Sequence, residues 1–272
     1  MTFPTTSIEG IELSRLVIGS NWLMGYSHQS AAKDRWIRSY MTRERIVQVL
    51  KAFVAQGINC ILSGTVPLMH EAIQVTEAET GVKLHWMCTP NGEHADDLMP
   101  GIEQCAEWGV TFCMPHQHWT DGNMVVNETR IIGIEQVTKR IRELGMIPGI
   151  STHRPETVVV CDRAGYDVAT YIQIYNALGF LCQIETDWIA KVIQGTPKPV
   201  IAIKPLAAGR LMPETGLGFV LNSIKPIDLV CVGCMTPDEA ESDVRITREI
   251  IGQGAAKTHD LAVSRSKGIL AY

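Results

Sequence analysis

Apolar residues fall into eight short runs along the chain, each bounded by polar residues or glycine. These runs are rich in Val and Ile and occupy residues 15–20, 58–64, 82–88, 110–115, 146–152, 170–176, 199–206 and 228–234. Short apolar runs of this composition are typical of buried β-strands. The pattern therefore predicts eight strands distributed over most of the chain.

Between these runs the apolar residues recur at helical spacing, most clearly over 43–57 and 129–145. The predicted helices end at glycines that would adopt a positive φ: Gly57, Gly81, Gly109, Gly145 and Gly165. Strands that alternate with helices predict a closed parallel (β/α)₈ TIM barrel. An open doubly wound sheet is the alternative, but no Gly-x-Gly-x-x-Gly follows the first strand.

Two further segments extend this plan. Residues 7–14 (SIEGIELS) predict a hairpin that plugs the bottom of the barrel. Residues 22–42 form the longest strand-to-helix connection and are rich in aromatic and charged side chains, which makes them a candidate lid over a site. No second domain is indicated, so residues 1–272 are predicted to form a single domain.

Composition and charge narrow the functional class. The net charge of −5 and the lack of a basic stripe argue against a nucleic-acid partner. No run approaches the roughly 20 apolar residues of a membrane span, and no leader is evident. Cys60, Cys88, Cys113 and Cys231 lie inside apolar runs as buried thiols, which indicates a reducing, cytoplasmic setting. The expected partner is a small-molecule substrate, and a homo-oligomer is left open.

The candidate chemistry lies at the carboxyl ends of the predicted strands, where barrel enzymes place their active sites. The stretch FCMPHQHWTDG carries His116 and His118, which point to the same side if the chain there is extended. His153 follows the fifth strand and Lys204 lies in the seventh. These four residues are predicted to be catalytic. Residues at or near other strand ends are predicted to bind substrate: Asn21, Trp22, Ser63, Asn91, Trp119, Tyr175 and Asn176.

Other roles are open for several of these residues. His116 and His118 with Glu93 suit a divalent metal, or the imidazoles hydrogen-bond their own loop. Lys204 is an electrostatic anchor or, when desolvated, a Schiff-base nucleophile. In the last predicted helix, Glu239, Glu241 and Asp243 are expected to complement the helix dipole and carry no chemistry.

Several stretches resemble the aldo-keto reductase superfamily over nearly the whole chain: ELSRLVIGS, VLKAFVAQGIN, GISTHRPETVVVCDRAGYDVATYIQIYN, IAIKPLAAGRL and VGCMTPDEAESDV. The resemblance implies a barrel that holds NADPH across the loops after strands 7 and 8. It also implies reduction of a carbonyl by an Asp, Tyr, Lys and His tetrad. The cofactor-binding residues that it implies here are Lys204, Leu206, Gly209, Arg210, Gly233 and Thr236.

Most of that tetrad is absent from the sequence. Ser63 stands near the place of the aspartate, and Pro90 or a neighbour near that of the lysine. No tyrosine occurs between Tyr40 and Tyr166, so only the histidine is retained, as His116 or His118. After the eighth strand, no basic residue precedes Arg245 to meet a 2′-phosphate.

Three interpretations follow, and the first is preferred. It is an aldo-keto-reductase-like enzyme that has lost the reductase tetrad and acts as an acid-base lyase or isomerase, with or without a divalent metal, on a small polar carbonyl or carbohydrate-like substrate. The second is a divergent NAD(P)H-dependent oxidoreductase. The third is a non-catalytic regulatory or binding subunit.

Overall fold

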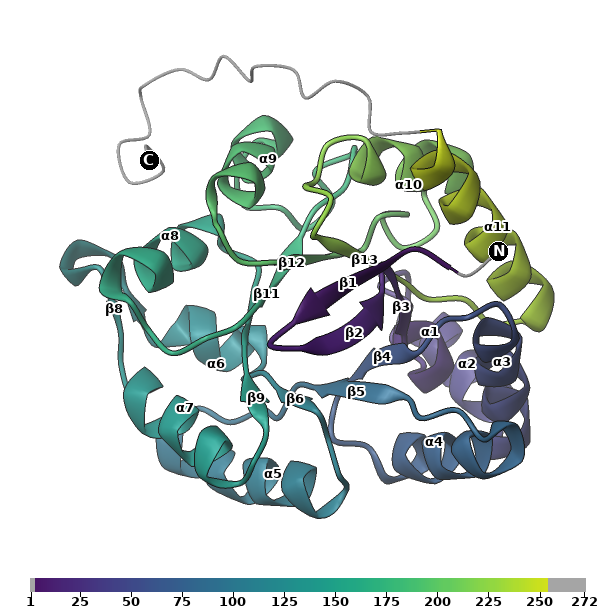
Figure 1. Ribbon diagram of the computed structural model, residues 1–272, viewed down its shortest axis with the longest axis horizontal. Helices are drawn as coiled ribbons and strands as arrows, with labels where there is room; N and C mark the ends of the chain where they lie inside the picture. Colours follow the sequence, from purple (N-terminus) through teal and green to yellow (C-terminus); the bar gives the residue numbers. More distant parts are fainter. Residues whose placement is uncertain (1–2, 254–272) are drawn as a thin grey trace.

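A parallel β-barrel forms the centre of the molecule (Figure 1). The structure is a computed structural model that describes residues 3–253. The barrel strands are β3 (Leu16–Gly19), β4 (Cys60–Ser63), β5 (His85–Cys88), β6 (Phe112–Cys113), β9 (Ile147–Pro148), β10 (Ile150–Thr152), β11 (Tyr171–Ile174), β12 (Val200–Ile203) and β13 (Leu229–Val232). Each of the eight predicted runs contains one barrel strand, because β9 and β10 are successive parts of the fifth.

The barrel closes through this divided fifth strand. β9 pairs with β6 on one side and β10 pairs with β11 on the other, so the ring of parallel pairing is complete. Gly149 separates the two parts, and a Cβ there would lie 2.9 Å from the Thr170 carbonyl oxygen and 3.0 Å from Met114 Cγ. Only glycine permits this close approach at the seam. The predicted (β/α)₈ barrel is therefore confirmed.

Helices cover the outside of the barrel (Figure 1). They are α3 (Arg43–Ala55), α4 (Pro67–Thr80), α5 (Ala95–Glu107), α6 (Gln117–Gly122), α7 (Ile134–Glu143), α8 (Pro155–Ala164), α9 (Thr186–Gly195), α10 (Pro213–Leu221) and α11 (Pro237–Gly252). The five glycines expected to end helices all have φ between 68° and 89°.

One helix begins later than the sequence pattern predicted. The predicted helix over 129–145 is α7, which starts only at Ile134. The residues before it form a small antiparallel pair, β7 (Met124–Val125) and β8 (Arg130–Ile131), linked by the 3₁₀ turn η1 (Val126–Glu128). Ile131 is buried in this pair, so its apolar side chain mimicked a helical position in the sequence.

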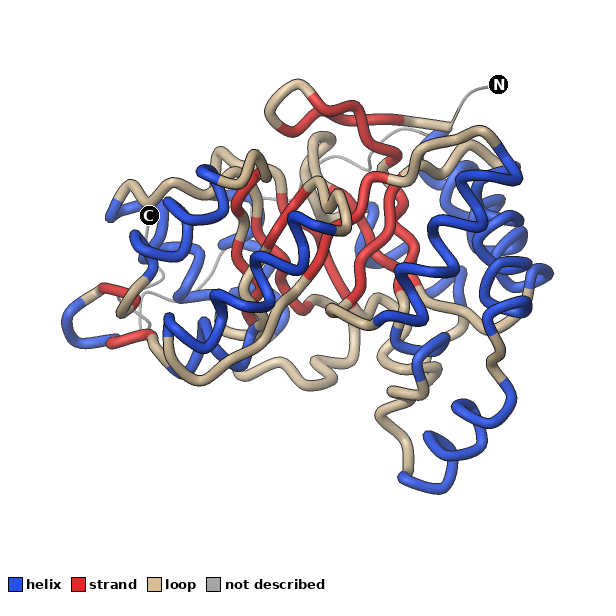
Figure 2. Tube along the Cα trace, turned by 90° about the horizontal axis from the view of Figure 1, so that it is seen from below, coloured by secondary structure: helices blue, strands red, loops and turns tan. Residues whose placement is uncertain are grey.

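The amino-terminal hairpin closes one end of the barrel (Figure 2). Its strands are β1 (Thr5–Ile8) and β2 (Ile11–Ser14), and Glu9 and Gly10 make the two-residue turn with φ of 47° and 82°. Ile8 and Leu13 pack with Val17 and Phe112 in the barrel interior. The hairpin thus acts as the predicted plug and leaves only the opposite end for a site.

The segment predicted as a lid lies at that opposite end. It folds into α1 (Asn21–Met24) and α2 (Ala31–Tyr40), and the Ser30 side chain caps α2 by accepting from Lys33 N. α2 projects from the body of the molecule (Figure 2). Its role as a lid stays a prediction.

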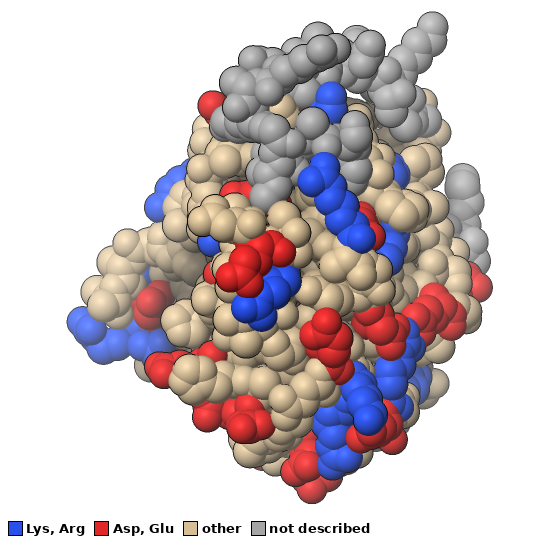
Figure 3. Space-filling model, turned by 90° about the vertical axis from the view of Figure 1, so that its left-hand side faces the viewer, with Lys and Arg blue, Asp and Glu red and all other residues tan. Residues whose placement is uncertain are grey.

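Acidic and basic side chains lie side by side on the face around α7 and α8 (Figure 3). Arg142 of α7 donates two hydrogen bonds of 2.6 Å to Glu9 and also binds Asp167, so this surface network ties the hairpin to α7. All eight cysteines are free. Within residues 3–253, no helix is long and apolar enough to cross a membrane.

Candidate functional site

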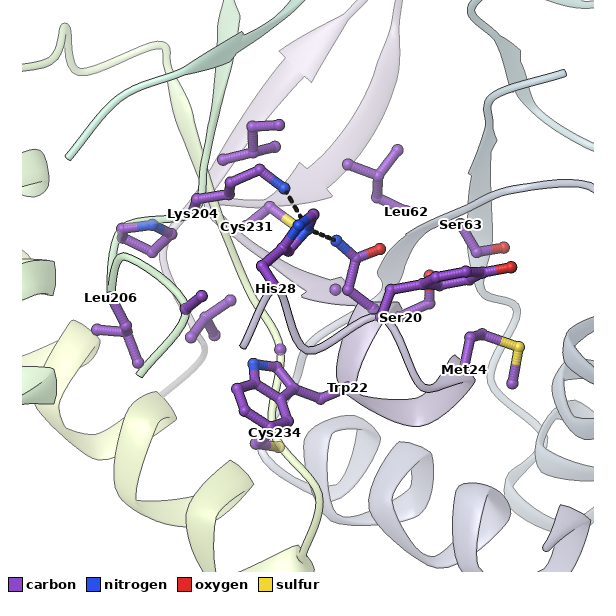
Figure 4. Close-up of a pocket in the computed structure, with 18 of the residues that line it drawn as sticks. Ser20, Trp22, Met24, His28, Leu62, Ser63, Lys204, Leu206, Cys231 and Cys234 are labelled. Carbon is purple, nitrogen blue, oxygen red and sulfur yellow. Dashed lines mark hydrogen bonds between the residues drawn. The ribbon is translucent and has the colours of Figure 1, made fainter. Parts of the chain in front are cut away.

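A large cavity opens at the carboxyl ends of the strands (Figure 4). Its volume is about 1040 Å³, and every barrel strand except β9 contributes at least one lining residue from the strand itself or from the loop that follows it. The connection between β3 and α3 supplies further walls, including Trp22, Met24, Tyr26 and His28. Pockets of about 300–1,000 Å³ hold drug-sized ligands, so this cavity accommodates a large ligand or two smaller ones.

Lys204 places an amine inside the cavity from the end of β12. Its φ is 60°, a conformation that costs a non-glycine residue roughly 1–2 kcal/mol and is often kept for function. The Nζ atom lies 2.9 Å from Nε2 of His28, a contact drawn in Figure 4. Burial lowers the pKa of Lys204 to about 8, and Cys231 opposes this effect. The amine is thus still mostly an ammonium at pH 7 but is poised to release its proton.

His28 reaches Lys204 from the connection between α1 and α2. It also has a positive φ, of 54°, and its carbonyl oxygen accepts a 3.3 Å hydrogen bond from Arg210. Burial and then the Lys204 charge lower the pKa of His28. An ammonium has only donors, so the neutral His28 Nε2 is the acceptor in the pair. The Lys204 ammonium therefore donates a hydrogen bond to His28 Nε2.

His116, from the loop after β6, and His153, from the loop after β10, line the same cavity. Burial is the main cause that lowers both pKa values, that of His153 to about 4, and the Lys204 charge adds to the effect. Asp121 of α6 positions His153, because its carboxylate accepts from His153 N at 2.9 Å and from the Thr152 hydroxyl. Near pH 7 the chamber thus holds neutral imidazoles around one ammonium.

Trp22 lines the cavity beside the loops after β12 and β13. Its indole contacts the loops after β12 and β13: a Cβ at Gly209 would lie 3.7 Å from Cζ2, and one at Gly233 would lie 3.4 Å from Cδ1. Figure 4 shows the ring between His28 and Cys234. We call the part of the cavity around Lys204, His28, His116 and His153 the inner chamber. We call the part of the cavity lined by residues at the start of α10, after β13 and in α11 the outer arm: Met212, Pro213, Cys234, Met235, Glu239, Ser242 and Asp243.

Asp243 is the unusual member of the outer arm, since it is only 4 % exposed. Within residues 3–253, no side chain or backbone group hydrogen-bonds or pairs with its carboxylate. Burial, and then the charges of Glu239 and Glu214, raise its pKa to about 7. The sequence assigned Glu239, Glu241 and Asp243 to the helix dipole. Glu239 does cap α11 by accepting from Thr236 N and Met235 N, whereas Asp243 faces the cavity.

Asp243→Asn is therefore expected to stabilise the protein above neutral pH. The folded-state pKa is raised from the usual 3.8 to about 7, so between these values the unfolded chain releases its proton first and native stability falls as the pH rises. A pKa shift of this size lowers the free energy of unfolding of the wild type by about 2–4 kcal/mol at pH 8. Urea unfolding at pH 4 and pH 8 measures it: the variant should match the wild type at pH 4 and exceed it at pH 8. The exposed Glu241→Gln is the control, and an equal gain there would contradict the burial argument.

The structure brings ten of the predicted site residues to the cavity: Asn21, Trp22, Ser63, Asn91, His116, His153, Lys204, Leu206, Gly209 and Gly233. Ser63 is already engaged, because its hydroxyl accepts from Trp86 Nε1 at 2.8 Å and donates to the Gly64 carbonyl.

The other predicted residues do not line the cavity: Glu93, His118, Trp119, Tyr175, Asn176, Arg210 and Thr236. For His118 the cause is local. The chain is not extended after His116, because α6 begins at Gln117 and His116 Nδ1 caps it by accepting from His118 N at 3.2 Å. His118 is consequently exposed, and the argument from alternating side chains was wrong.

Packing explains most of the remaining differences. Trp119 is fully buried in the core outside the barrel, and Tyr175 packs there too, with its hydroxyl 2.9 Å from Ser223 Oγ. Asn176 is buried and holds its own loop through Phe180 N and the Phe180 carbonyl. Arg210 instead stacks on the Phe180 ring.

The suggested metal ligands are likewise not brought together. His118 and Glu93 are both exposed and outside the cavity, while His116 alone lines it. In the described part of the chain, no group of three or more His, Cys, Asp or Glu side chains has a metal-binding arrangement. Thr236, which was assigned to a cofactor, caps α11 by accepting from Glu239 N.

Three residues of the site were not found from the sequence: His28, Asp121 and Asp243. The only signal for His28 was its place in the longest strand-to-helix connection. Asp121 lies five residues after His116, in a stretch that the sequence suggested to be a polar, glycine-containing loop. Asp243 had the pattern of an ordinary carboxylate in the first turns of a helix, and its burial distinguishes it.

The fold is that of the aldo-keto reductases. An aldo-keto reductase from Klebsiella pneumoniae in complex with NADPH matches with a TM-score of 0.62 and 18% identity over 93% of this chain and 94% of that one. Glycerol dehydrogenase AKR11B4 from Gluconobacter oxydans matches with a TM-score of 0.61 and 14% identity over 97% and 100%. A Pseudomonas aeruginosa protein assigned to the aldo-keto reductases matches with a TM-score of 0.68 and 14% identity over 92% and 97%.

Comparisons of sequence alone find nothing. No known family matches the chain, and no curated protein does. The likeness is thus one of fold, and it covers the whole described barrel.

Proposed function

We propose that this protein is an NAD(P)H-dependent oxidoreductase that interconverts a small carbonyl compound and the corresponding alcohol. The observation that carries the proposal is the Lys204 amine, which lies in the cavity 2.9 Å from His28 with a pKa of about 8. Proton transfer is most efficient when the pKa of the acid is near the working pH. Lys204 thus acts as the proton donor.

The cavity fits a nicotinamide cofactor together with a small substrate. Its volume of about 1040 Å³ exceeds what a small carbonyl compound needs. The half-buried indole of Trp22, between the loops after β12 and β13, offers a flat surface on which an aromatic ring stacks. When bound, the cofactor supplies the hydride. Trp22, Leu206, Gly209 and Gly233 are the residues that would contact it.

The chain's own groups then handle the proton. As a carbonyl is reduced, negative charge develops on its oxygen, and the Lys204 ammonium stabilises this charge and transfers a proton to it. His28 accepts a hydrogen bond from Lys204 and orients the amine. His28 is exposed at the mouth of the cavity, so it connects the amine to solvent for reprotonation. His116 and His153, both neutral near pH 7, leave Lys204 as the acidic group of the chamber.

Cofactor titration and a substrate panel test the proposal. We expect NADH or NADPH to quench protein fluorescence with a Kd in the micromolar range, and absorbance at 340 nm to fall when small aldehydes or ketones are added. Trp22→Phe should remove part of the quenching if the cofactor contacts that ring, whereas the exposed Trp36→Phe should not. Absence of any dinucleotide binding would contradict the proposal. Conversion of a carbonyl substrate without cofactor would restore the lyase or isomerase interpretation.

A further inference from the structure

Within residues 3–253, the outer arm of the cavity carries negative charge and no positive charge. Asp243 and Glu239 both line it, and Glu214 is close enough to raise the pKa of Asp243. Among the described residues, no Lys or Arg belongs to the arm. The two lysines of the cavity, Lys33 and Lys204, come from α2 and the end of β12.

The nearest basic residue in the sequence is not available to the arm. Arg245 lies two residues beyond Asp243, yet it is exposed and pairs with Glu249 at 3.2 Å on the surface of α11. Among residues 3–253, a phosphate monoester in the arm would thus face carboxylates without a compensating cation. Like charges brought together in a partly dehydrated site strongly disfavour binding.

Asp243 is an unpartnered buried carboxylate that faces this space. It is only 4 % exposed, and none of the described residues donates to it. Burial of a charge without a partner is costly, so such a group is retained where a ligand completes it. A carboxylate only accepts hydrogen bonds when ionised, which suits a ligand hydroxyl.

We propose that the outer arm binds a ribose with free hydroxyls and excludes a 2′-phosphate, so that this protein uses NAD(H) in preference to NADP(H). The inference rests on the proposed function. If the reacting ring of a dinucleotide lies in the inner chamber beside Lys204, its other end extends past Trp22 into the outer arm. There Asp243 accepts from the ribose hydroxyl, as acidic residues do in NAD sites of other folds. The Klebsiella pneumoniae structure, by contrast, contains NADPH.

Parallel binding titrations of the full chain with NADH and NADPH test the preference directly. We expect NADH to bind at least about tenfold more tightly at pH 8, where Asp243 is ionised. Competition with fragments gives a second readout that needs no turnover: 5′-ADP should displace NADH, and 2′,5′-ADP should not. Equal affinities, or tighter binding of NADPH, would overturn the inference and leave the proposed function standing. Failure of both dinucleotides to bind would overturn both.

Two variants assign the preference to this arm. Asp243→Asn should weaken NADH binding about tenfold and reduce the difference in affinity between NADH and NADPH. Asparagine has the shape of aspartate but lacks its charge, so the substitution removes the ionised acceptor. Ser242→Arg places a cation in the outer arm and should increase the affinity for NADPH about tenfold. Glu241→Gln removes an exposed charge from the same helix outside the cavity and is the matched control. If NADH is preferred but neither cavity variant changes that preference, the residues that select NADH lie elsewhere. This result would overturn the assignment of the preference to the outer arm.

Discussion

Lys204→Met is expected to lower kcat for carbonyl reduction by about 10²–10⁴-fold, while cofactor affinity changes little. The reason is the loss of the one ammonium in the inner chamber, since a positioned general acid typically contributes this much to the rate. Stopped-flow or steady-state absorbance at 340 nm measures the effect. The exposed Lys139→Met is the matched control and should retain full activity, because Lys139 lies on α7 with 78 % of its side chain exposed.

The pH dependence separates a proton donor from a merely structural lysine. With a pKa of about 8, Lys204 is protonated below that pH, so kcat for reduction should be flat there and fall about tenfold per unit above it. Lys204→Arg keeps the charge but does not titrate in this range, so the fall should disappear. Unfolding should show Lys204→Met to be no less stable than wild type near pH 7. The folded-state pKa is lowered, so the buried ammonium costs stability there. A fall in activity accompanied by loss of folding would contradict the assigned role.

Trp119→Ala is expected to lower the free energy of unfolding by about 3–5 kcal/mol, which makes it the largest stability effect that we predict. Trp119 is fully buried in the core between the barrel and its helices and does not line the cavity. Its removal leaves a large void that the surrounding helices fill only in part. Urea unfolding at pH 7 measures the loss.

The control for this prediction is Trp36→Ala. Trp36 is 49 % exposed on α2, where it stacks on Tyr40, so its removal should cost less than about 1 kcal/mol. KM measured on folded Trp119→Ala should stay near that of wild type. A raised KM without loss of stability would return Trp119 to the substrate-binding role that its place in the sequence suggested.

The barrel was predictable because each of its strands is a local feature. A strand buried on both faces must be apolar along its whole length, and a crossover to a parallel neighbour must be a helix with one apolar face. Both requirements produce a recognisable pattern of apolar residues in the sequence. The exceptions are informative: the apolar residue Ile131 packs in the β7–β8 pair, and the pattern alone extended a helix over it.

The site was less predictable, because it depends on where loops place side chains. His116 and His118 looked equivalent until α6 began between them and turned His118 to solvent. His28 and Lys204 are far apart in the sequence, and their contact exists only because the connection after β3 reaches over the barrel mouth to the loop after β12. Asp243 has an ordinary sequence context and an unusual environment.

The sequence by itself determined the eight strands, the hairpin that plugs the barrel and the end of the barrel at which polar side chains gather. Periodicity and strand direction suffice for these, since they depend on neighbours a few residues apart. Only the tertiary structure decided which side chains meet in one cavity and which carboxylate is buried without a partner. Those outcomes depend on packing between loops distant in the sequence, and burial in turn sets the pKa values that give Lys204 and Asp243 their chemistry.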